Sequence, residues 1–182
     1  MRGHDEGKPL AAAFSAGTTL GGLLTGAGLA VLGGLLSVLP VDLRLITAVV
    51  IVLALVVTDL LSATLPLPQR DTLIPQEVFA RGMGSGLFRF GVEYGLGWRV
   101  LVPSAAPWIL ATTLVLLNLP WWQTVLAGAL FGLGRSVAIW QMLFFADDGW
   151  QEPLVRHSRT LEQLGSLVTA ALVVAVVLAQ LT

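Results

Sequence analysis

The chain has 182 residues, with ten Lys and Arg, eleven Asp and Glu, no Cys and a formal net charge of -1. Only 12% of the residues are charged and 55% are hydrophobic, whereas about a quarter of a soluble domain is charged. This composition excludes an ordinary soluble enzyme, a disordered chain and a disulfide-stabilised secreted domain. It predicts an all-α, polytopic helical membrane protein whose partner is the lipid bilayer. The small net charge excludes a basic field for nucleic acid.

Long apolar runs set the expected topology. A helix needs about 20 apolar residues to cross a bilayer core of roughly 30 Å. Such runs predict five transmembrane helices in a single domain covering residues 1–182. Their expected bounds are roughly 12–38, 43–63, 102–117, 120–145 and 164–181. The break between the third and fourth spans lies at Asn118-Leu119-Pro120, because proline is disfavoured inside a helix.

The segment 81–99 is less easily assigned. It contains six glycines, which lower helix propensity, together with the internal charges Arg89 and Glu93. Those two residues stand four apart and can pair on one helix face. We expect a Gly-rich interfacial or re-entrant element here. The alternative is a sixth span, which would give six helices as a 3+3 inverted repeat.

The distribution of basic residues favours five spans. With an N-terminus inside, the five-span arrangement places eight Lys and Arg inside and only Arg44 outside. Six spans give four on each side, which is no bias. The preference for Arg over Lys, with abundant Ala, Gly, Val and Leu, is typical of a GC-rich bacterial genome. We therefore expect a multi-pass protein of the bacterial cytoplasmic membrane with a cytoplasmic N-terminus.

Two stretches of the sequence are alike. Residues 35–61 and 113–137 each contain the end of an apolar helix, a Leu-Pro connection and a second apolar helix. One interpretation is that any tight helical hairpin needs such a turn. The other is a duplicated unit, as occurs in transporters. Six spans would give the two copies opposite orientations, whereas five spans would give the matching hairpins the same orientation.

Charges inside predicted spans are costly and are functional candidates. Asp59 lies near the end of the second span and Arg135 lies deep in the fourth. Both would approach the cytoplasmic side, so an Asp59–Arg135 contact is a hypothesis; the alternative is that each ends its helix among lipid headgroups. Arg89, Glu93 and Arg99 form a second cluster. It is either the solvated face of an amphipathic helix or part of an ion, proton or anion path.

Small residues four apart allow helices to pack closely. The candidate packing glycines are Gly17, Gly21, Gly22, Gly26, Gly91, Gly95, Gly128 and Gly132. They indicate close packing within the bundle or against another subunit.

Motifs that carry chemistry are missing. The sequence has no nucleophile elbow, phosphate loop or zinc-protease pattern, and the acidic loop 147–162 matches no recognised metal-ligand spacing. We therefore predict no catalytic residues, no cofactor and no metal site.

One stretch resembles a known family. Residues 94–117, YGLGWRVLVPSAAPWILATTLVLL, resemble the start of the fourth helix in the CcdA/DsbD-type membrane thiol-electron transporters. Gly97 and Trp98 match that family's Gly-Trp pair, and Pro103 and Pro107 stand where prolines flank its cysteine. This chain has no cysteine, so electron transfer through thiols is excluded. The resemblance covers about one helix and implies at most a three-plus-three helical scaffold.

The sequence supports two main hypotheses of function, with a membrane-embedded enzyme as a third and weaker one. The first is a non-enzymatic subunit, which assembles or anchors a larger membrane complex. It rests on the small size, the short loops, the glycine-rich faces and the missing catalytic motifs. The alternative is a small transporter or channel-like protein that uses its intramembrane charges. Either would form a homo- or hetero-oligomer with other membrane subunits.

Overall fold

The computed structural model describes residues 2–61, 82–97, 105–145 and 156–181, and no strand occurs among them. The prediction of an all-α protein is confirmed. The helices are α1 (Arg2–Leu36), α2 (Val41–Leu60), α3 (Met83–Gly95), α4 (Ala106–Leu116), α5 (Trp121–Phe145) and α7 (Ser158–Leu181). They occupy the apolar runs of the sequence and, in the case of α3, the glycine-rich segment.

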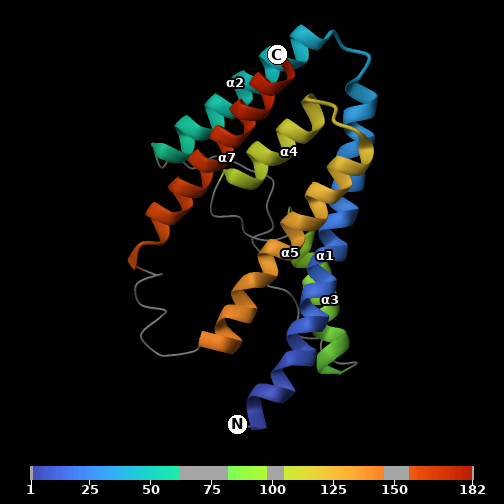
Figure 1. Cartoon of the computed structure of the whole chain (residues 1–182), viewed down its shortest axis with the longest axis vertical. Coiled ribbons are helices and arrows are strands. Elements are labelled where there is room, and N and C mark those ends of the chain that lie inside the picture. The colour runs from blue at the N-terminus through green and yellow to red at the C-terminus, as the bar shows by residue number, and fades with distance from the viewer. Residues whose placement is uncertain (1, 62–81, 98–104, 146–155, 182) are drawn as a thin grey trace.

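The helices form two groups that lie side by side (Figure 1). In one group α1 packs extensively against α3 and α5, and in the other α2, α4 and α7 pack on one another. The second group has an aliphatic core, formed by Val52, Ala105, Ile109 and Val173. Contacts between α1 and α4 join the two groups.

Glycine contacts fix the directions of the helices in the first group. Gly17 of α1 meets α3 at Phe88 and Gly91, and Gly21 meets it at Gly95, so α1 and α3 run parallel. On another face, Gly22 and Gly26 meet α5 in reverse order of its sequence, so α5 runs antiparallel to α1. The absence of side chains allows these backbones to approach closely.

Helices α3 and α4 are short, with thirteen and eleven residues. The last residue of α3, Gly95, packs on Thr18 and Gly21, near the middle of α1. A Cβ added to Gly33, near the end of α1, would lie 3.1 Å from the carbonyl oxygen of Val115 in α4. Helix α3 therefore accompanies the first part of α1, and α4 accompanies the second part.

The two halves of the chain exchange their middle helices. Helix α5 of the second half packs with α1 and α3, whereas α2 of the first half packs with α4 and α7. We can match α1, α2 and α3 of the first half with α4, α5 and α7 of the second. The packing of α1 on α5 then corresponds to that of α4 on α2, α1 on α3 corresponds to α4 on α7, and α2 on α7 corresponds to α5 on α3. Because the hairpins α1–α2 and α4–α5 turn at the same end of the molecule (Figure 1), the halves repeat in one orientation. This differs from the inverted repeat considered from the sequence.

The buried positions of α2 and α5 agree with the same pairing of the two halves. In both α2 and α5 the positions four, eight and twelve residues after the Leu-Pro turn are buried. These pairs are Arg44 and Thr124, Ala48 and Gly128, and Val52 and Gly132. Each helix therefore buries one face, and that face begins four residues after the turn in both.

Two segments of the described helices, Gly7–Leu36 and Val41–Leu60, are long and apolar enough to cross a membrane, by length and composition alone. Helix α4 is apolar but shorter.

Candidate functional site

The most unusual feature of the fold is the break between α3 and α4. Helix α3 ends at Gly95, and Gly97 then adopts a positive φ of 77°, a conformation that suits glycine. The carbonyl of Leu96 accepts a 3.0 Å hydrogen bond from the hydroxyl of Thr25 in α1. Helix α4 begins with Pro107 in its first turn, where a proline needs no hydrogen-bond donor. The break thus leaves two helix ends beside α1.

Arg135 of α5 lies at this break. Its guanidinium carbon is 3.9 Å from the ring centroid of Tyr94 and 5.6 Å from that of Phe131. One guanidinium nitrogen would lie 3.7 Å from a Cβ on Gly97. The cation is therefore placed over an aromatic face and next to the C-terminal end of α3, where the helix dipole favours positive charge.

Tyr94 is itself held in an aromatic group. Its ring centroid lies 6.0 Å from that of Phe90 and 5.8 Å from that of Phe14 in α1. Phe14 is buried, with 5% of its surface exposed. The packing of these rings fixes the aromatic face that Arg135 contacts.

A cavity of about 680 Å³ opens at the same break. Its wall combines one stretch of α1 with the end of α3, the first turns of α4 and part of α5. The residues that line it are Leu24, Thr25, Gly28, Leu29, Val31, Leu32, Leu96, Gly97, Pro107, Trp108, Leu110, Ala111, Leu114, Gly128 and Phe131. This lining is almost entirely apolar, and its volume falls within the range of about 300–1,000 Å³ that is usual for ligand pockets.

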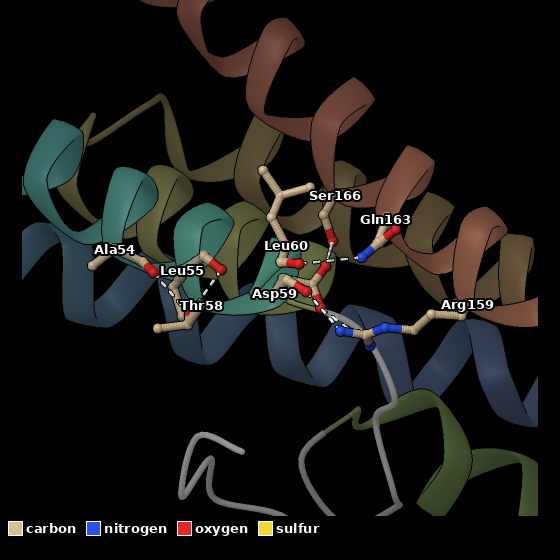
Figure 2. Close-up of polar contacts among 8 residues, drawn as sticks. All are labelled: Ala54, Leu55, Thr58, Asp59, Leu60, Arg159, Gln163 and Ser166. Carbon is tan, nitrogen blue, oxygen red and sulfur yellow. Dashed lines mark hydrogen bonds and ion pairs between the residues drawn. The ribbon is translucent and has the colours of Figure 1, made fainter. Parts of the chain in front are cut away.

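Asp59 belongs to a different site, at the end of α2 (Figure 2). Its carboxylate is buried and accepts a 2.5 Å hydrogen bond from the hydroxyl of Ser166 in α7. Arg159 places one nitrogen 3.7 Å from this carboxylate and donates a 2.6 Å bond to the backbone carbonyl of Asp59. Gln163 reaches the carbonyl of Leu60 at 3.5 Å. The cluster joins the C-terminal end of α2 to the N-terminal part of α7.

The hypothetical contact between Asp59 and Arg135 is not formed. The structure places them in different helix groups, with Arg159 and Ser166 on Asp59 and Tyr94 on Arg135. The hypothesis assumed that two charges near one membrane face must meet. It could not anticipate that α2 and α5 are exchanged between the two groups.

The structure describes two of the three members of the second predicted cluster. On α3, Arg89 is exposed and Glu93 is half-buried, while Arg99 lies outside the described residues. All eight predicted packing glycines lie at contacts between helices of this chain. Gly17 and Gly21 meet α3 at Gly91 and Gly95, and the other two glycines of α1 meet α5 at Gly128 and Gly132.

Sequence reasoning missed several residues of these sites. Arg44 was counted only as an outside charge, yet it is buried, and its Nε and one terminal nitrogen have no hydrogen-bond partner among the described residues. Ser166 and Arg159 belong to no recognised sequence motif. The residues that line the cavity are apolar, like those on any packed face of a helix.

Within the described ranges no three His, Asp or Glu side chains gather as a metal site. No family model, curated protein or solved structure matches the chain.

Proposed function

We propose that the chain is a multi-pass membrane protein, and the polarity of α2 carries this proposal. Arg44 and Asp59 of this helix are only 8% and 9% exposed, although charged side chains normally face water. The outer face of α2 is aliphatic instead. Its most exposed positions include Ile46, Val50, Leu53 and Val57, each at least half exposed. A continuous aliphatic surface of this kind suits hydrocarbon as the surrounding solvent.

The proposed topology has five crossings. Helices α1, α2, α5 and α7 each make one, and α3 and α4 together make the third as two half-length helices in line. The Trp pair at the start of α5, Trp121 and Trp122, is 72% and 53% exposed and fits an interfacial anchor. In this arrangement the chain positions of Arg2, Lys8, Arg70, Arg81 and Arg156 fall on the side where α1 begins, whereas the turns 37–40 and 117–120 on the other side contain no Lys or Arg. The N-terminus is therefore cytoplasmic under the positive-inside rule.

Single cysteines test this topology, because the chain contains none of its own. We expect Ser37→Cys and Trp121→Cys to react with a membrane-impermeant maleimide in intact cells. Ser85→Cys should react only in inverted vesicles. Labelling of Ser37→Cys and Trp121→Cys from opposite sides would favour six spans. Recovery of the protein outside the membrane fraction, with equal labelling of all three cysteines once the cells are opened, would overturn the membrane proposal.

Within the membrane, we propose a small carrier-type protein that binds its ligand at the break between α3 and α4. Discontinuous helices form the substrate sites of many transporters near the bilayer midplane. An arginine at membrane depth is a functional candidate by default, and Arg135 stands beside this break. The matching arrangement of helices in the two halves supports the same proposal.

The second candidate is an assembly or anchoring subunit. The aliphatic stripe on α2 favours it, because Ile46, Val50, Leu53 and Val57 recur at the helical spacing of a packing face. Expression of the chain alone in a heterologous bacterial membrane separates the candidates. The carrier proposal expects a folded particle with one size in detergent. Degradation of the lone chain, with rescue only by other subunits from its native membrane, would favour the assembly role.

A further inference from the structure

We propose that the cavity at the helix break holds a single hydrocarbon chain of a membrane lipid. This inference rests on the membrane location proposed above and names the class of ligand for that same site. It follows from the lining, the shape and the opening of the cavity.

The lining excludes water as the natural occupant. A buried water needs two to four polar partners, and cavities lined by apolar groups stay dry. Of the side chains around this cavity, the hydroxyl of Thr25 already donates to the carbonyl of Leu96, and the indole N–H of Trp108 is one buried donor without a partner among the described residues. An empty volume of about 680 Å³ would leave the surrounding side chains without contacts on one side. A hydrocarbon ligand restores those contacts and brings no polar group of its own into the cavity.

The shape favours a chain over a compact molecule. The cavity follows α1 from Leu24 to Leu32, which corresponds to about 12 Å at 1.5 Å per residue. It follows α4 from Pro107 to Leu114 over a similar length. Gly28 lies midway along the α1 wall and has open space where a side chain would be. The missing side chain leaves room for the ligand along this wall.

The opening identifies the source of the ligand. Leu24, Val31 and Leu32 line the cavity, yet 52%, 64% and 50% of their surfaces are exposed. They lie within Gly7–Leu36, the segment of α1 that is apolar enough to cross a membrane. The cavity therefore opens sideways, toward the hydrocarbon around α1. The bilayer supplies acyl chains at that depth.

Photolabelling in vesicles tests the proposal. The protein is reconstituted in phosphatidylcholine that carries a diazirine near the end of one acyl chain, and labelled residues are located by mass spectrometry. We expect Leu29 and Ala111, which are half-buried in the cavity wall, to be labelled as strongly as Leu53, which is 58% exposed on α2. If lipid only contacted the outer surface of the protein, Leu29 and Ala111 would be labelled far less than Leu53.

Two variants provide a matched comparison. Gly28→Trp should fill the cavity and lower labelling of Leu29 and Ala111 by roughly an order of magnitude, because packed interiors leave no room for a second occupant. Gly34→Trp, on the same helix and also with open space at its Cβ, should leave it unchanged. Ala111→Phe fills the cavity from α4 and should repeat the loss if Gly28→Trp fails to fold.

The outcomes separate this inference from the membrane proposal. Strong labelling of Leu53 with only background labelling of Leu29 and Ala111 would overturn the lipid-chain site alone. Labelling of the cavity that persists in both filling variants would overturn it as well. No labelling at any position, Leu53 included, would overturn both proposals.

Discussion

At the scale of single residues, the burial of Arg44 is the feature that calls most for an explanation. Its guanidinium is buried one turn into α2 with two nitrogens unpartnered among the described residues. It also lies at the positive end of the helix dipole, which disfavours a cation. We expect Arg44→Met to raise the free energy of unfolding by about 1–3 kcal/mol, because it removes an unsatisfied buried charge.

Thermal unfolding in detergent, followed by tryptophan fluorescence, measures this effect. The control is Arg89→Met on α3, where the side chain is exposed and the change should stay within about 0.5 kcal/mol. A clear loss of stability in Arg44→Met would contradict this expectation, because it would mean that the guanidinium has a polar partner in the folded protein.

The Asp59 cluster gives a second prediction at this scale. Ser166→Ala should cost about 1.5–3 kcal/mol, since it removes a buried hydrogen bond to a charged group. Arg159→Ala should cost only about 0–1 kcal/mol through the ion pair, because 44% of the Arg159 side chain is exposed. Thr169→Ala is the control, because that hydroxyl bonds only within its own helix. A double-mutant cycle with Asp59→Ala in which Ser166→Ala costs as much as before would contradict the assignment.

At the scale of helices, two glycines of α5, Gly132 and Gly134, allow a comparison of a packed position with an open one. A Cβ on Gly132 would collide with the backbone carbonyl of Thr18 in α1, whereas Gly134 has open space. We expect Gly132→Ala to separate α1 from α5 and to cost several-fold more than the roughly 1 kcal/mol that alanine gains in helix propensity. Gly134→Ala should be neutral or slightly stabilising. Unfolding temperatures in one detergent decide the comparison, and equal values for both variants would contradict the close packing.

The sequence was informative about the existence of the helices and less so about their arrangement. Hydropathy alone located α2 and α5 to within a few residues, because long apolar runs dominate that signal. It left 81–99 uncertain, since six glycines weaken helix propensity. The structure shows why α3 is helical nevertheless: the same glycines allow close packing on Gly17 and Gly21.

The site was harder to predict for a related reason. The partners of Asp59 lie on α7, with Ser166 separated from it by 107 residues, and no spacing rule links such distant positions. The position of Arg135 depends on where α3 stops. The direction of the short helices also follows from tertiary contacts, which a hydropathy pattern does not contain.

At the scale of the whole molecule, the exchange of α2 and α5 makes the halves interdependent. We expect residues 1–100 and 101–182, expressed separately, to be unstable, because each half lacks the middle helix of its own group. Expressed together, the two pieces should assemble, and a tag on one should recover the other in equal amount. A folded, monodisperse preparation of either piece alone would contradict the exchanged arrangement.

The same arrangement has a consequence for biogenesis. When α2 leaves the ribosome, neither α4 nor α7 has been made, so in the topology proposed above Asp59 enters the bilayer before Ser166 exists. At about 5–20 residues per second, the wait is roughly 5–20 s for a separation of 107 residues. During that interval an acidic side chain has no protein ligand in the lipid. The newborn hairpin must remain at the insertion machinery, or hold its carboxyl near the headgroups, until the final helix arrives.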